Sequence, residues 1–440
     1  MRATAILLKY VSGLLIIVGS LLVTACASAG TTSATEQSTP TSPLQPASPT
    51  SSWQAIHAPG TNLEFLTYTV SPTDPETIYA CTSNGSSPTQ NPITLWRTQD
   101  AGQHWIALHL PAANGTDCEI AIAPTQPQHI AVLITNPDEN ARPCDNDVLY
   151  LSNDSGASWR HIPYSSIAPQ GARIVFCQVT VTNHYLYLCY SFGGGQGSPQ
   201  VSLLERTGDN GTSWTRIDTT FGSNALFLPP QVGPDDTLAL IVRHSPAKAQ
   251  DKPVLWVTSN AGSAWQQMGM LPSAIGTYLL VPPATHDSWL TAATPFYALA
   301  AEQIPSNLYR EQVFESGNGQ HWATIPPLPV PRVSATQPGL LQALAVTNDG
   351  RLLAFGLNPR SGLSGSTSNA QKTSTFWLWI WNPSTSRWQF LPTPLNHPAD
   401  ESCGLCWNGQ ISTASDGSSY LYVYHWDDTG SFFRVRPPSV

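Results

Sequence analysis

Charged side chains are scarce in this chain. Only 11% of its 440 residues are Asp, Glu, Lys or Arg, against about 25% in an average soluble protein. Lysine occurs 4 times and methionine 3 times. Because Glu and Lys usually cover the solvent-facing sides of helices, this shortage disfavours a protein of long helices. The net charge is −9 and there is no basic run, so we expect no nucleic-acid partner.

Apolar residues and turn formers are plentiful by contrast. Residues of apolar type make up 41% of the chain, enough for a large core, and there are 31 Gly, 39 Pro and 15 Trp. Glycine and proline favour turns, and aromatic residues favour strands. The composition therefore predicts an all-β protein of many short strands.

The first 26 residues have the features of an export signal. Arg2 and Lys9 precede an uncharged apolar stretch from 11 to 25, which is short for a membrane span. It ends in Leu22-Val-Thr-Ala-Cys26, which resembles the lipobox of bacterial lipoproteins. The resemblance implies lipidation of Cys26 and an exported body anchored to the membrane, on the extracellular or periplasmic side. An ordinary cleaved signal or an uncleaved anchor are the alternatives, and both also imply export.

A polar segment follows the signal. Of the 26 residues from 27 to 52, 17 are Ser, Thr or Pro, and such a stretch buries too little apolar area to offset its ordering entropy. We therefore expect residues 1–26 to be the signal, 27–51 a disordered tether, and 52–440 the folded domain.

A short pattern recurs through the folded part: Ser or Thr, x, Asp or Asn, x, Gly, x, x, Trp. Each copy lies between two apolar strands, and the tryptophans are spaced by 51 to 66 residues. Asp or Asn caps a tight turn, Gly supplies a positive φ, and Trp begins the next strand and covers the hairpin. The copies are Asp100, Gly102 and Trp105; Asp154, Gly156 and Trp159; Asp209, Gly211 and Trp214; Asn260, Gly262 and Trp265; a weaker one with Gly319 and Trp322; and a sixth that keeps only Trp388.

This pattern resembles the Asp box, also called the BNR repeat. The box is found in sialidases, sortilin-type receptor domains, some glycoside hydrolases and photosystem II assembly factors. The resemblance implies a β-propeller, and the strands and turns between the boxes agree with four-stranded antiparallel blades.

Counting the units predicts seven blades. Six are complete, and the last, 408–437, has three strands. The missing outer strand is available at 52–57, where Trp53 lies 52 residues before Trp105. Pairing the two ends of the domain would close the ring without an unpaired edge. A six-bladed ring with an extra hairpin is the alternative.

Seven cysteines follow Cys26, and disulfides are the default in an exported protein. Cys177 and Cys189 flank one turn symmetrically, so we expect them to pair across two strands. Cys118 has Cys144 or Cys81 as possible partners. The Cys403-Gly-Leu-Cys406 motif predicts a local disulfide, since a zinc site would need a second ligand pair. We expect no metal and no cofactor.

A ligand site is expected at the mouth of the central channel. The boxes join the third and fourth strands of each blade, so they belong to the opposite face and are scaffold. The mouth instead collects the connections between second and third strands and those between blades. The binding residues we expect there are Arg142, Asp145, Asp147, Arg173, Arg243 and His244. Asp117 and Glu119 lie on the same face.

Sialidase activity is not supported. Sialidases hold their substrate carboxylate with three arginines, the first of them upstream of the first box, and this chain has no arginine between Arg2 and Arg97. We therefore expect a surface-tethered, non-catalytic propeller that binds a glycan or a protein ligand at the channel mouth. The alternatives are a glycoside hydrolase that uses two channel-mouth carboxylates, and an assembly factor for a membrane complex.

Overall fold

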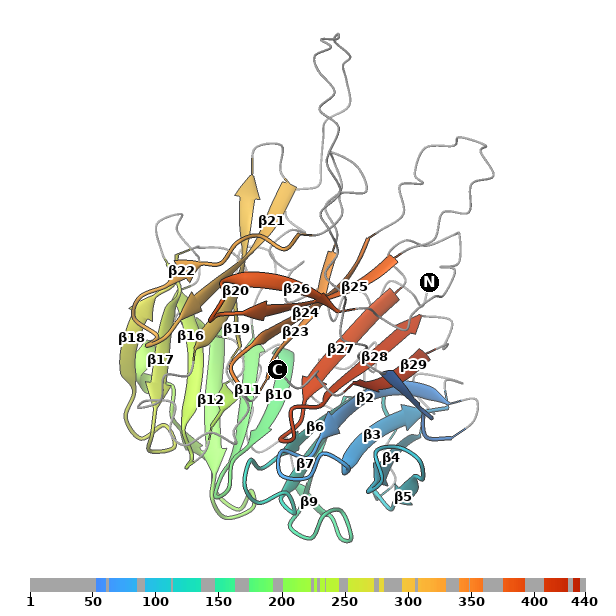
Figure 1. Cartoon of the computed structure of the whole chain (residues 1–440). Helices are drawn as coiled ribbons and strands as arrows, with labels where there is room; N and C mark the ends of the chain where they lie inside the picture. The colour runs from blue at the N-terminus through green and yellow to red at the C-terminus, as the bar shows by residue number, and fades with distance from the viewer. Residues whose placement is uncertain are drawn as a thin grey trace, which may run out of the picture. The chain divides into compact units, whose positions relative to one another are not determined.

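The computed structural model describes nineteen segments of the chain between residues 53 and 435 (Figure 1). They are 53–60, 63–84, 92–111, 114–135, 147–162, 174–192, 201–222, 225–227, 230–233, 235–244, 252–272, 277–280, 295–304, 308–329, 340–347, 349–358, 375–391, 407–425 and 430–435. In these segments no helix is long and apolar enough to cross a membrane. The predicted signal and tether lie outside them.

The strands of the described segments form seven antiparallel sheets, one for each blade. Blade one contains β2 (Glu64–Val70), β3 (Ile78–Ser83), β4 (Ile93–Thr98) and β5 (Ile106–Leu108). Blade two contains β6 (Asp117–Ile122), β7 (Ile130–Thr135), β8 (Val148–Ser152) and β9 (Arg160–Ile162). Blade three contains β10 (Ile174–Val181), β11 (Leu186–Phe192), β12 (Val201–Thr207) and β13 (Thr215–Arg216), followed by the 3₁₀ turn η1 (Thr219–Phe221).

The inner strand of blade four is split in two. This blade contains β14 (Ala225–Phe227), β15 (Gln231–Val232), β16 (Leu238–His244), β17 (Val254–Thr258) and β18 (Gln266–Met270). Blade five contains β19 (Thr277–Leu280), β20 (Phe296–Ile304), β21 (Leu308–Ser316) and β22 (Ala323–Thr324). Blade six contains β23 (Leu340–Val346), β24 (Leu352–Asn358), β25 (Thr375–Asn382) and β26 (Arg387–Leu391).

Blade seven joins the two ends of the folded domain. It contains β27 (Trp407–Thr413), β28 (Ser419–His425), β29 (Gly430–Val435) and, as its outer strand, β1 (Trp53–Ile56). β1 pairs antiparallel with β29 from Trp53 opposite Val435 to Ile56 opposite Phe432. The inner strands β27 and β2 also contact each other, as do the inner strands β6 and β10. The seven-bladed, N-terminally closed ring is therefore confirmed, and the six-bladed alternative is wrong.

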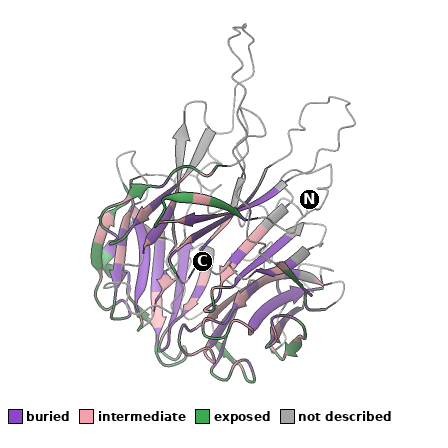
Figure 2. Cartoon of the chain, in the orientation of Figure 1, coloured by how far each residue is buried: buried purple, intermediate pink, exposed green. Residues whose placement is uncertain are grey.

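The core lies between the blades rather than within one layer. The second strand of a blade is flanked by two strands and covered by both neighbouring blades, so β3 is buried along its whole length (Figure 2). Outer strands are exposed, for example β13 and the tip of β18 at Met270. This pattern explains why second strands are continuous apolar runs while outer strands are short and polar.

The Asp boxes form nearly identical turns. In the first, the Thr98 hydroxyl donates to Asp100 Oδ1 at 2.7 Å and accepts the Gly102 N–H at 2.9 Å. The backbone N–H of His104 donates to the same carboxylate oxygen at 2.9 Å. These hydrogen bonds, led by the one from His104, hold the pKa of Asp100 well below its ordinary value. The box Asp or Asn is therefore a backbone cap, as predicted.

The weak fifth box keeps this cap with a different residue. Asn318 accepts hydrogen bonds from the backbone of Gln320 at 2.9 Å and of His321 at 3.1 Å. This turn is one residue shorter than the others, since Asn318 lies four residues before its tryptophan and Asp100 lies five before its own. Counting back five residues from Trp322 therefore places Gly317 at the Asp position. The capping function is retained although the sequence pattern suggests that it is lost.

The box tryptophan connects neighbouring blades. Trp105, Trp265 and Trp388 donate their indole N–H to backbone carbonyls of His57, Ile217 and Pro326, at 2.8, 2.9 and 2.8 Å. Each acceptor lies three or four residues after the equivalent tryptophan of the preceding blade. For His57 this equivalent tryptophan is Trp53, on β1. The first blade therefore binds the end of β1 just as blades four and six bind the chain after the outer strands of their predecessors.

The box glycine is required by the same contact. Gly102 has a φ of +88°, and a Cβ atom there would lie 2.0 Å from Ile56 Cγ2 on β1. Gly262 has the same relation to Ile217 of the blade before it, with a Cβ at 2.4 Å from Cδ1. Glycine is thus needed both for the turn and for close packing between blades.

Replacing Gly102 by alanine is expected to lower the free energy of unfolding by about 2 kcal/mol, because a strained φ adds to a clash with the closing strand. Gly350→Ala is the control: its φ is +80°, and the nearest atom to the added Cβ is Pro295 Cδ at 3.2 Å. Urea unfolding of both variants separates the two effects. Equal losses in the two variants would show that the contact with Ile56 has no energetic role.

Candidate functional site

The two faces of the ring differ in the connections that they carry. Most connections on the box face are short. Seven residues or fewer join each of the pairs β2–β3, β4–β5, β6–β7, β8–β9, β12–β13 and β17–β18, whereas residues 281–295 join β19 to β20. The opposite face holds long connections of unequal length, at 136–147, 163–173, 325–339, 359–374 and 392–406. We call it the long-connection face. It is the face on which the sequence predicts a ligand site.

Three of the six predicted binding residues lie in the described part of the chain. Asp147 is 5% exposed and directly precedes β8 of blade two. Arg243 and His244 end β16 of blade four, where Arg243 is half-buried and His244 is exposed. Blade three separates Asp147 from the other two in chain order, so the structure places them on one face but on different blades. Arg142, Asp145 and Arg173 lie outside the described residues.

Two carboxyl groups lie on the inner strand of blade two. Asp117 and Glu119 are two residues apart on β6, so their side chains point to the same side of the sheet. Glu119 Oε2 accepts the backbone N–H of Val179, on the inner strand of blade three, at 3.0 Å. Asp117 Oδ1 accepts the N–H of Cys118 at 2.9 Å. Because β6 begins at the long-connection face, both residues lie on the inner strand close to that face.

Burial changes the chemistry of Glu119. Loss of hydration raises its pKa to about 8, and the negative charge of Asp117 acts in the same direction, against the lowering effect of the Val179 hydrogen bond. Burial therefore favours the protonated form of the Glu119 carboxyl group. The sequence placed Asp117 and Glu119 on this face but did not mark Glu119 as buried. The signal that could have done so is their spacing of two residues within an inner strand, where solvated loop charges are not expected.

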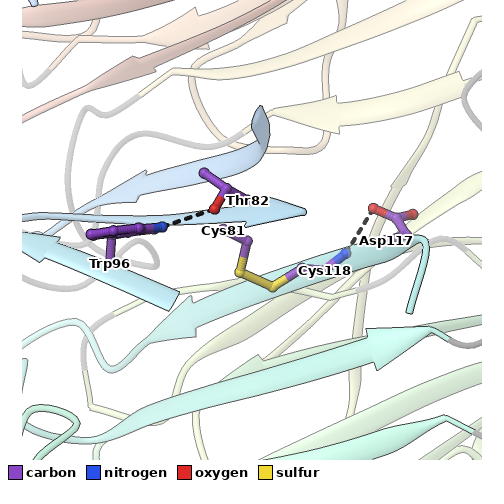
Figure 3. The surroundings of a disulfide bond; sticks show 5 residues. All are labelled: Cys81, Thr82, Trp96, Asp117 and Cys118. Atoms are coloured by element: carbon purple, nitrogen blue, oxygen red, sulfur yellow. Dashed lines mark hydrogen bonds between the residues drawn. A yellow bond between two sulfur atoms is a disulfide. The ribbon is translucent and has the colours of Figure 1, made fainter. Parts of the chain in front are cut away.

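A disulfide fixes the strand that carries this pair. Cys118 lies between Asp117 and Glu119 and is bonded to Cys81 on β3 of blade one (Figure 3). Both cysteines are buried, at 4% and 0% exposure. Beside it, the indole of Trp96 donates to the Thr82 hydroxyl at 2.8 Å. The bond therefore joins two blades at the inner edge of the ring.

The predicted pairing of Cys177 with Cys189 is wrong. Cys189 is a free, buried cysteine, and in the backbone register it lies opposite Gln178, while Cys177 lies opposite Tyr190. The two cysteines are symmetric about the turn in the sequence, but the pairing of β10 with β11 is shifted by one residue from that symmetry. They therefore do not lie opposite each other. Cys144, Cys403 and Cys406 lie outside the described residues. Among the side chains that the structure describes, no group of three His, Cys, Asp or Glu residues could hold a metal ion.

Comparison with known proteins shows the fold and nothing finer. No family model matches the chain, and no curated protein matches it. Among solved structures it is similar to YCF48 from Cyanidioschyzon merolae, with 12% identity, a TM-score of 0.48, and coverage of 88% of this chain and 99% of that one. An ulvan lyase of polysaccharide lyase family PL25 has 10% identity, a TM-score of 0.50, and coverage of 85% and 95%.

A sialidase from Trypanosoma rangeli, in complex with 2,3-difluorosialic acid, is also similar. It has 13% identity and a TM-score of 0.41, with coverage of 85% of this chain and 54% of that chain. These likenesses are distant and concern the fold alone. By its seven sheets and its box turns the chain is a seven-bladed propeller with Asp-box-like turns, and its likeness to YCF48 and to the sialidase is distant.

Proposed function

We propose that this protein is an exported propeller, lipid-anchored through Cys26, that binds a glycan or a protein ligand without catalysis at the channel mouth. The observation that carries this proposal is the difference between the two faces. Short box turns on one face repeat because they pack blade against blade. The long connections assigned to the other face differ in length from blade to blade, and binding residues concentrate in connections of that kind.

A glycan array combined with pull-down from secreted proteins tests this proposal, using residues 52–440. We expect a ligand whose affinity falls about tenfold in Arg243→Ala, since a lost polar contact to a ligand costs about 1–2 kcal/mol. Arg387→Ala is the control, because Arg387 is exposed on the outer strand β26. Binding that is unchanged in Arg243→Ala but lost when box-face residues are replaced would contradict the proposed location.

A second candidate function, glycoside hydrolysis, is favoured by one specific observation. The raised pKa of Glu119 favours its protonated form beside Asp117, and the Cα atoms of residues two apart on a strand lie about 7 Å from each other. Carboxyl groups that kept this spacing would have the separation found in inverting glycosidases. Here Glu119 would protonate the leaving oxygen, and Asp117 would act as the ionised partner.

A hydrolysis screen with pH profiles tests the second candidate. Turnover should be lost in Glu119→Gln and should decline as the pH rises through about 8, because the acid then loses its proton. Asp235→Asn, an exposed carboxylate in a box-face turn, is the control. Turnover that survives both Glu119→Gln and Asp117→Asn would exclude this pair as the catalytic machinery.

A further inference from the structure

One aromatic position recurs on the third strand of several blades. It lies nine residues before the box tryptophan, and in blades one, two, four and six it is occupied by Trp96, Tyr150, Trp256 and Trp379. In a propeller, the third strand of one blade lies near the chain that leaves the outer strand of the preceding blade. The recurring aromatic side chain therefore reports on what fills the space between two blades at the outer side of the ring.

In blades two and four this space is filled by the connection from the preceding blade. The Tyr150 hydroxyl donates to the carbonyl oxygen of Pro111 at 3.2 Å, and Pro111 follows the outer strand of blade one. Phe221 follows the outer strand of blade three and packs edge-on against Trp256, with the ring centroids 5.4 Å apart. A short piece of polypeptide thus supplies a carbonyl acceptor in one case and an apolar ring in the other.

The equivalent aromatic residue of blade six lacks these contacts. Among the described residues, Trp379 has one ring contact, with Phe390 of its own blade at a centroid distance of 5.3 Å. Its indole N–H is buried and has no acceptor there, and the same is true of Trp377, two residues earlier on the same side of the sheet. Trp377 is only 3% exposed. Because buried N–H groups are almost always paired, this part of blade six is short of hydrogen-bond acceptors.

Phe390 turns this place into an open aromatic surface. It lies opposite Trp379 in the register of β25 and β26 and is 44% exposed, on an outer strand that is exposed along most of its length (Figure 2). The residue at the same place is Ala107 in blade one, His161 in blade two and Gln267 in blade four. Of these four blades, blade six alone therefore has two apolar rings side by side.

We propose that Trp379 and Phe390 form a second binding site, on the outer side of blade six, for a short proline-containing peptide segment of a partner protein. The segment takes the place that the connection from the preceding blade has in blades two and four. Proline offers an apolar ring, and its segment offers carbonyl acceptors in an extended conformation; aromatic surfaces bind segments of this kind. Phe390 packs against the ring of the proline, and the indole N–H of Trp379 donates to a carbonyl oxygen.

The size of the surface favours a short segment over a folded partner. The large apolar side chains that are exposed in the described part of the chain are Ile106, Met270 and Phe390, and they lie on three different blades. The patch at Phe390 is therefore on the order of 100 Å², whereas a stable protein interface buries about 800 Å² on each partner. A sugar ring has a similar size, but polypeptide fills the equivalent place in blades two and four, which favours a peptide.

A peptide array tests the proposal with the full chain. It carries seven-residue peptides with a central proline, and the reference peptide has the sequence of residues 108–114, whose proline covers Tyr150 in blade two. The peptide that binds best is then labelled, and its dissociation constant is measured by fluorescence anisotropy. A glycan array is probed in parallel, and urea unfolding establishes that each variant is folded.

We expect the affinity for the peptide to fall about tenfold in Phe390→Asp and several-fold in Trp379→Phe, which keeps a ring but removes the N–H. Ile106→Asp is the matched control, because Ile106 is 57% exposed on the outer strand of blade one, and its affinity should equal that of the parent chain. The proposal is overturned by an array on which no peptide binds, or by an affinity that Phe390→Asp leaves unchanged. A glycan that binds through Phe390 where no peptide does would also overturn it.

Discussion

Replacing Arg434 by methionine is expected to lower the free energy of unfolding by about 2 kcal/mol, below the range for a fully buried pair because both carboxylates are partly exposed. The Arg434 side chain is only 6% exposed, and it contacts Glu76 of blade one at 2.7 Å and Asp416 of blade seven at 3.1 Å. Its guanidinium also lies over the ring of Tyr420 at 5.5 Å. Methionine keeps the apolar stem but leaves two carboxylates facing each other without the cation between them.

The effect is expected to be large because this contact supports the closure of the ring. β29, which carries Arg434, is the strand that holds the N-terminal β1. Urea unfolding measures the loss, and hydrogen exchange of residues 53–56 should accelerate in the variant. Arg387→Met is the control, since an exposed arginine on β26 should change stability by less than about 0.5 kcal/mol. A loss of similar size in both variants would show that the bridge between blades is not the cause.

Removing the disulfide by a double replacement of Cys81 and Cys118 with alanine is expected to cost about 4 kcal/mol. The bond closes a segment with a sequence separation of 37, and the chain-entropy model assigns this order of stabilisation to such a loop. The bond also joins blade one to blade two, where strands of the two sheets are not hydrogen-bonded to each other. Its loss should therefore favour opening of the ring between these blades.

Urea unfolding under oxidising conditions measures this cost. Cys189→Ala is the matched control, because it removes a buried cysteine that forms no bond, and it should cost only about 1 kcal/mol for the lost sulfur. If the double variant is no less stable than Cys189→Ala, the bond contributes nothing beyond packing. Glu119 lies next to Cys118, and because its pKa is raised, the folded state loses stability as the pH rises through about 8. If the double variant no longer shows this pH dependence of unfolding, Glu119 is no longer buried in it.

The closure strand was predictable from sequence, and the reason is local. Trp53 stands at the spacing of the box tryptophans, and Ile56 follows it at the distance at which Leu108, Ile162 and Ile217 follow theirs. In the structure these residues pack against the box glycine of the next blade. A repeat must satisfy the same backbone geometry and the same neighbour in each blade, so its residues recur and can be recognised.

The disulfide pairing and the site chemistry were less accessible. Cys177 and Cys189 were paired by symmetry about their turn, but a shift of one residue in register separated them. Cys81 meets Cys118 only because β3 and β6 belong to adjacent blades. The sequence does not distinguish Glu119 from the other carboxylates of the long-connection face, because its burial comes from contact with the inner strand of blade three.

The sequence alone determined the architecture: the box turns, the number of blades and the closing strand at 53–56. These follow from short-range constraints, because each box satisfies its own backbone with its own side chains. The tertiary structure alone decided which cysteines bond and which carboxyl group lies against the next blade. Those properties depend on strands from different blades meeting in space, and spacing along one chain does not contain that information.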